Sequence, residues 1–167
     1  MKKIGIFYGS TLGHTKAVAE QIRQAFGAEN ADIFSIDKAT VADVEKYDSL
    51  IFGTSTWGVG EMQEDWETFS RSMEGVDFSS KKLALFGVGD QRQWPDSFVN
   101  GLGSLYHHFK DKITIIGSTS TAGYQFEISL AIRDNRFVGL VIDNVNQADL
   151  TPTRIQNWVK SLQAEFE

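Results

Sequence analysis

Small hydroxyl side chains follow the first apolar run of the chain. Ile4–Tyr8 is the short apolar run typical of a buried strand, and apolar residues recur at helical spacing over His14–Phe26. Residues 9–15 between them carry hydroxyls and two glycines. Because the first N–H groups of a helix lack acceptors and carry the positive end of its dipole, this turn predicts a phosphate site. An ordinary strand-to-helix turn with a Ser or Thr cap is the alternative.

The spacing of this turn excludes two common phosphate-binding motifs. A nucleotide triphosphatase loop needs G-x-x-x-x-G-K-[ST]. Here only three residues separate Gly9 from Gly13, and His14 stands where the lysine would be. The dinucleotide fingerprint G-x-G-x-x-G is also absent from the turn. What is left is a site of neutral donors, which suits a single terminal phosphate such as that of flavin mononucleotide (FMN).

Composition limits the class of protein. The 167 residues, 41% hydrophobic and 23% charged, predict one globular domain spanning residues 1–167. With no cysteine, disulfides and Cys-ligated metals are excluded. The net charge of −6 argues against nucleic acid or an anionic membrane as a partner and suits a basic protein. We expect no signal peptide and no membrane span, and therefore a cytoplasmic protein.

Apolar strands alternate with amphipathic helices along the chain. Strands are predicted at residues 4–8, 33–36, 49–53, 82–88 and 113–117, and helices at residues 14–26, 41–47, 63–73, 97–109 and from Thr151, read as a cap, onward. This alternation predicts a parallel sheet covered on both faces. Residues 118–138 are polar and break the pattern, so we interpret them as an insertion in the last strand, which resumes at residues 137–142.

Three loops leave the carboxyl ends of the predicted strands, and ligands bind at such ends in open α/β sheets. These loops are residues 9–15, 54–61 and 89–96. The second contains Trp57 and the third Trp94, so two indoles could enclose a flat ring beside the phosphate site. The alternative is that each Trp serves only packing. Adjacent His107 and His108 do not suggest a metal site, and no metal is expected.

Six blocks of sequence, in order, resemble the flavodoxins, specifically their long-chain form. They are Ile4-Gly5-Ile6-Phe7-Tyr8-Gly9-Ser10 with Gly13 and Thr15, Thr54-Ser55-Thr56-Trp57-Gly58-Val59-Gly60-Glu61, Asp77-Phe78, Ala84-Leu85-Phe86-Gly87-Val88-Gly89-Asp90-Gln91, Thr121-Ala122-Gly123-Tyr124-Gln125-Phe126-Glu127, and Phe137-Val138-Gly139-Leu140-Val141-Ile142-Asp143. The resemblance covers essentially the whole chain. It implies a flavodoxin-like three-layer α/β sandwich with a five-stranded parallel sheet in the order 2-1-3-4-5 and an insertion in the last strand.

The resemblance also implies a function and a set of binding residues. The expected function is low-potential one-electron transfer by a non-covalent FMN, without catalysis of a second substrate. The cofactor-binding residues expected in the three loops are Ser10, Thr11, Leu12, Gly13, His14, Thr15, Thr54, Ser55, Thr56, Trp57, Gly58, Val59, Gly60, Gly89, Asp90, Gln91 and Trp94. Residues 10–15 would wrap the phosphate, Trp57 and Trp94 would cover the two flavin faces, and Gly89, Asp90 and Gln91 would meet the pyrimidine edge.

Two features of the sequence suggest how a flavin would be tuned. Glycine reaches positive φ at little cost, so the Gly58 carbonyl could turn toward flavin N5–H after the first electron and proton arrive. Gly58 could equally serve only a tight turn. Between Glu61 and Asp77 lie six acidic residues and one basic residue, Arg71. These acids would disfavour the second electron and attract a basic partner, or simply form a solvated helix face.

The expected partners are redox proteins with basic docking surfaces, for example a flavodoxin reductase or pyruvate oxidoreductase, and the chain is expected to be a monomer. Two other classes remain as alternatives at this stage. One is an NAD(P)H:quinone oxidoreductase on the same fold, which needs an open pocket over the flavin. The other is a flavin-free phospho-receiver, which needs acids after the first strand that residues 3–10 do not offer.

Overall fold

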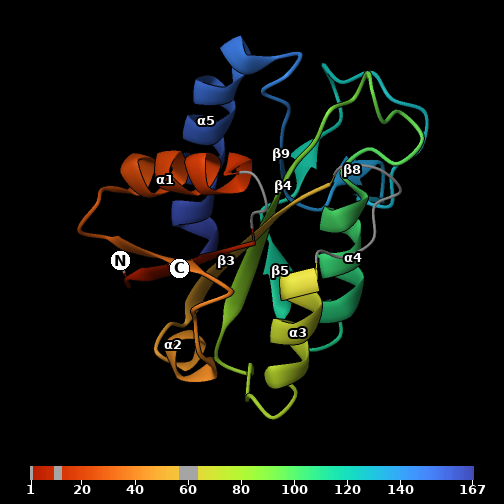
Figure 1. Ribbon diagram of the computed structural model, residues 1–167. Helices are drawn as coiled ribbons and strands as arrows, with labels where there is room; N and C mark the ends of the chain where they lie inside the picture. The colour runs from red at the N-terminus through yellow and green to blue at the C-terminus, as the bar shows by residue number, and fades with distance from the viewer. Residues whose placement is uncertain (1, 10–12, 57–63) are drawn as a thin grey trace.

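A parallel β-sheet with helices on both faces forms the centre of the computed structural model, which describes residues 2–9, 13–56 and 64–167 (Figure 1). The sheet strands are β1 (Ile4–Tyr8), β2 (Ala31–Ser35), β3 (Ser49–Ser55), β4 (Lys82–Val88), β5 (Thr114–Ile116) and β9 (Leu140–Ile142). Their order is β2-β1-β3-β4-β5, with β9 also bonded to β4. The predicted order 2-1-3-4-5 is confirmed.

The helices are α1 (His14–Phe26), α2 (Val41–Glu45), α3 (Glu64–Ser72), α4 (Asn100–Phe109) and α5 (Thr151–Glu165), with a short 3₁₀ turn at Ala148–Leu150. In Figure 1, α1 and α5 lie on one side of the sheet and α3 and α4 on the other. The three-layer sandwich is therefore confirmed. No helix in the described ranges is both long and apolar enough to cross a bilayer.

Side-chain alternation along the strands divides the core in two. Ile4 and Ile6 of β1 join the cluster under α1 and α5, whereas Phe7 joins the cluster under α3 and α4. Ala84 and Leu85 of β4 divide in the same way. Successive side chains of a strand point to opposite faces, so a strand buried on both sides has no room for polar residues. This is why the sheet strands appear in the sequence as continuous apolar runs.

The fifth strand is split by the insertion. β5 pairs with residues 82–84 of β4, and β9 pairs in parallel with residues 86–88 of the same strand. Gly139 directly precedes β9 and lies against β4, where a Cβ would be 2.0 Å from the Leu85 carbonyl oxygen. Only glycine fits this close approach without a shift of the backbone. An insertion in the last strand, as predicted, is what the structure contains.

The insertion forms a small antiparallel sheet of β6 (Thr119–Ser120), β8 (Arg136–Phe137) and β7 (Ile132–Arg133), in that order. The prediction that the last strand resumes at residue 137 is wrong, because Phe137 pairs with Thr119 and Ile132 and its ring packs on Phe98. Phe137 is fully buried, so its apolar side chain would fit a strand of the main sheet as well as one of the small sheet. The Tyr124 hydroxyl, which donates to the Val141 carbonyl at 2.6 Å, ties the insertion back to β9.

Two predicted helix starts also need correction. The fourth helix begins at Asn100, not residue 97, after Val99 adopts a left-handed conformation with φ +46°. Thr151 is the first residue of α5 and not its cap, because its hydroxyl donates to Asn144 Oδ1 at 2.5 Å. A local Ser or Thr signal does not distinguish a cap from a hydroxyl that bonds elsewhere.

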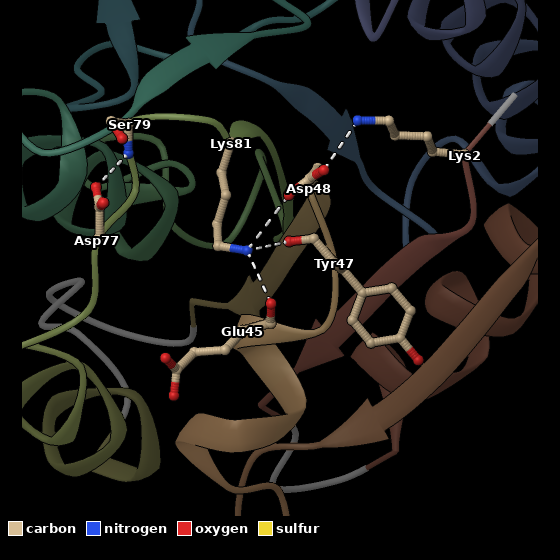
Figure 2. A network of polar contacts seen from close by, with 7 residues as sticks. All are labelled: Lys2, Glu45, Tyr47, Asp48, Asp77, Ser79 and Lys81. Carbon is tan, nitrogen blue, oxygen red and sulfur yellow. Dashed lines mark hydrogen bonds and ion pairs between the residues drawn. The ribbon is translucent and has the colours of Figure 1, made fainter.

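A buried lysine joins the amino ends of two strands, at the edge of the sheet remote from the predicted binding loops. Figure 2 shows Lys81 Nζ directed at oxygens of Glu45, Tyr47 and Asp48, at the end of α2 and in the turn that leads to β3. It donates to the carbonyls of Tyr47 (2.6 Å) and Glu45 (3.1 Å) and lies 3.7 Å from Asp48 Oδ1, while Lys2 binds the same carboxylate at 2.9 Å. Lys81 is 6% exposed, so these bonds replace its hydration.

Candidate cofactor site

The three predicted binding loops start at one edge of the sheet. The Gly9 N–H donates to the Gly53 carbonyl, and the Thr56 N–H donates to the Val88 carbonyl, both at 3.0 Å. The Gly89 N–H in turn donates to the Ile142 carbonyl at 3.0 Å. These bonds continue the ladders of β1, β3, β4 and β9 beyond their last paired residues. The structure thus brings the starts of residues 9–15, 54–61 and 89–96 together, as the parallel topology predicts.

The start of α1 offers a buried hydroxyl. Thr15 is fully buried, and within the described ranges its Oγ1 has no hydrogen-bond partner. The first turn of α1 contains no acidic residue, and Gly13 precedes it at φ +81°, in the left-handed region that suits glycine. A buried hydroxyl without a hydrogen bond is unfavourable unless a ligand supplies the missing partner. Thr15 is therefore suited to donate to an anion held at this helix N-terminus.

The second loop leaves β3 as a buried hydroxyl-rich segment. Thr54, Ser55 and Thr56 are all at most 9% exposed. Thr56 Oγ1 accepts from the Gly101 N–H at 2.7 Å, and a Cβ at Gly101 would lie 2.6 Å from the same oxygen. This contact fixes the N-terminus of α4 against the end of β3. In the described structure the Thr56 hydroxyl thus joins the end of β3 to the start of α4.

Part of the predicted site lies outside the described residues. Those positions are Ser10, Thr11, Leu12, Trp57, Gly58, Val59 and Gly60. The stacking role of Trp57 and the rotation of the Gly58 peptide stay predictions. His14 is exposed at the start of α1, and Glu61, the first of the acidic run, also lies outside the described residues.

The third loop is tightly folded. Asp90 and Gln91 are 6% and 4% exposed, and Trp94 is half-buried. Asp90 Oδ1 accepts from the backbone N–H groups of Arg92 (3.1 Å) and Gln93 (3.0 Å), and the Trp94 N–H donates to the Asp90 carbonyl at 3.0 Å. A side-chain carboxylate that caps its own turn holds the turn in one conformation. The backbone of residues 89–91 is therefore rigidly presented at the site edge.

A buried carboxylate behind this loop was not singled out as a binding residue by sequence reasoning. Asp143 follows β9 and is fully buried, and its Oδ2 accepts from the backbone and side-chain nitrogens of Gln91 at 3.0 and 2.8 Å. Burial raises the pKa of the Asp143 carboxyl, but bonds from Asn146 and Gln91 outweigh burial and hold the pKa below its usual range. In the sequence, Asp143 ends the sixth block that resembles the flavodoxins, and the interpretation there is that it helps to terminate the last strand, with a role near the ribityl chain of a flavin as an addition.

The acidic face of α3 is exposed. Glu64, Asp65 and Glu67 lie in its first turn, where negative charge is favoured by the helix dipole. Glu67 pairs with Arg71 at 2.8 Å across an exposed i,i+4 contact.

The described residues contain no group of three or more His, Asp or Glu side chains that could hold a metal.

Comparison with known proteins agrees with this geometry. A family model described as Flavodoxin matches residues 6–158. The flavodoxin of Synechococcus elongatus is 45% identical over 172 aligned positions, which cover 99% of each chain. Flavodoxin 1 of Azotobacter vinelandii is 44% identical over 171 positions, which cover 99% of this chain and 98% of the relative.

A solved structure matches across the whole chain. The crystal structure of Fusobacterium nucleatum flavodoxin bound to flavin mononucleotide superposes with a TM-score of 0.93 and 33% sequence identity, and the match covers 100% of both chains. Similarity of this extent in sequence and in fold, together with the split fifth strand, places the chain in the flavodoxin family, in its long-chain form.

Proposed function

We propose that this protein carries one non-covalent FMN and passes single electrons at low potential between a reductase or oxidoreductase and acceptor redox enzymes. The observation that carries the proposal is the buried Thr15 hydroxyl at the N-terminus of α1, which has no hydrogen-bond partner among the described residues and lies at the edge where the predicted binding loops begin. Bound FMN supplies the redox chemistry, since a flavin accepts electrons one or two at a time.

The chain's own residues bind and orient the cofactor in this proposal. Residues 10–15 hold the phosphate with backbone N–H groups and hydroxyls. Trp57 and Trp94 cover the flavin faces, and the backbone of residues 89–91 meets its pyrimidine edge. Aromatic faces and the net negative charge of the acids around α3 disfavour extra negative charge on the ring, which keeps the potential of the second electron low.

The redox partners would be proteins with basic docking surfaces, such as a flavodoxin reductase or a pyruvate oxidoreductase. The exposed acids Glu64, Asp65 and Glu67 support this part of the proposal. Surface charge of this kind raises association rates more than affinity, and salt screens it. We further propose a monomer of a single domain that works in the cytoplasm without nucleic acid or membrane.

The test compares FMN with riboflavin, which lacks the phosphate. Apoprotein is titrated with each, and quenching of flavin and tryptophan fluorescence is followed. We expect one FMN per chain and markedly weaker riboflavin binding, followed by two separated one-electron steps in a redox titration. Equal affinity for both ligands would contradict the phosphate site. NADPH-dependent quinone reduction by the FMN-loaded protein alone would instead indicate a flavin enzyme.

A further inference from the structure

One amide side chain joins the third predicted binding loop to the residue that follows β9. Asn146 Nδ2 donates to Asp90 Oδ1 at 2.7 Å and to Asp143 Oδ2 at 2.9 Å. An amide nitrogen has two hydrogens, so both are used. Asn146 therefore bridges the carboxylate that caps the loop and the carboxylate at the end of β9.

Both carboxylates depend on neutral donors. Asp143 also accepts from the backbone N–H groups of Val145 and Asn146 at 3.1 and 3.0 Å. Among the residues that the structure describes, no ion pair joins Asp90 or Asp143 to a basic side chain. Without the Asn146 amide, the two buried acids would lose the donor that they share. Leaving a buried charge short of donors is costly, so the loop would move toward water.

Gln91 extends the same network to the insertion. Its Nε2 donates to Asp143, and its Oε1 accepts from the Gln125 N–H at 2.7 Å. The N–H groups of Glu127 and Ile128 donate to the Pro95 carbonyl farther along the loop. The loop is thus tied at several points to segments that follow it by 30 residues or more in the chain, and Asn146 is the group that joins the two acids.

We infer that Asn146 is a positioning residue of the cofactor site, which by bridging Asp90 and Asp143 fixes the backbone that meets the flavin edge. The inference rests on the proposed function, in which residues 89–91 face the pyrimidine ring. Asn146 acts through Asp90 and Asp143. A loop held in its bound conformation before the cofactor arrives pays less ordering entropy on binding.

The test is Asn146→Ala, with Gln147→Ala as matched control. Gln147 is the adjacent amide and also makes two side-chain bonds, to the Gly123 carbonyl and to Arg154, but none to residues 89–94. We expect Asn146→Ala to raise the FMN dissociation constant about tenfold, the factor that 1.4 kcal/mol gives, and Gln147→Ala to leave it nearly unchanged. Midpoint potentials of the two electron steps should shift only in Asn146→Ala.

A second variant and amide hydrogen exchange test the same inference independently. Asn146→Ser retains one short donor and should give an intermediate dissociation constant. Amide hydrogen exchange of Arg92 and Gln93 in each apoprotein should be faster in Asn146→Ala than in the control. Unchanged affinity, potentials and exchange in a variant that binds FMN would overturn the inference. So would failure of both Asn146 variants to fold, since Asn146 would then support the whole fold. Absence of FMN binding by the parent protein would instead refute the proposed function.

Discussion

Replacement of Thr15 by valine should change apoprotein stability and FMN affinity in opposite directions. Valine has the shape of threonine without the hydroxyl, and the two have similar helix propensities. Because Thr15 Oγ1 is buried and has no partner within the described residues, its removal relieves a desolvation penalty of about 1–3 kcal/mol. The apoprotein should therefore be more resistant to urea.

In the proposed site, the same substitution removes a donor to the cofactor phosphate. A hydrogen bond to a charged group contributes about 1.5–3 kcal/mol, so FMN affinity should fall about ten- to a hundredfold. Riboflavin, without a phosphate, should bind Thr15→Val and the parent equally well. Thr15→Ser keeps the hydroxyl and serves as control, with FMN affinity close to that of the parent.

The assays are urea unfolding of the apoprotein and fluorescence titration with each ligand. A less stable Thr15→Val apoprotein would show that the hydroxyl is bonded within the protein. Unchanged FMN affinity would show that Thr15 does not reach the phosphate. Either result would refute the reasoning that assigns the buried hydroxyl to a ligand.

Three further predictions concern the framework around the site. Lys81→Met should lower the free energy of unfolding, measured with urea, by about 1–3 kcal/mol, because the buried ammonium donates to two backbone carbonyls. The control Lys82→Met removes only an exposed hydrogen bond and should lower the free energy of unfolding less. Gly139→Ala should cost at least about 1–3 kcal/mol, since a Cβ would lie 2.0 Å from the Leu85 carbonyl; an equally stable variant would refute the close approach. The folded-state pKa of Asp143 is depressed, so its stabilisation should be present above about pH 5 and lost as the pH falls below the ordinary value of 3.8; urea midpoints of Asp143→Asn should depend less on pH across that window.

Much of the fold could be predicted from local pattern. The strands at residues 4–8 and 82–88 and the helix at residues 14–26 have the predicted bounds. The helix repeats the helical period over its whole length, and strands buried on both faces form continuous apolar runs. The order of the sheet came with the family resemblance.

Other features depended on contacts distant in sequence. Phe137 could belong to either sheet, and only its pairing with Thr119 and Ile132 assigns it to the small one. Thr151 resembles a cap, but Asn144 lies where its hydroxyl can reach it. Helix and strand periods record which face is buried, and they say nothing about which distant partner a polar group finds.

The sequence by itself determined the layers and the edge of the sheet at which the predicted binding loops start, because these follow from the alternation of apolar strands and amphipathic helices along the chain. Only the tertiary structure decided that Asn146 joins Asp90 to Asp143 and that Thr15 is buried without a partner among the described residues. Whether a buried polar group finds a hydrogen-bond partner depends on segments that are distant in the chain, so no local sequence pattern can predict it.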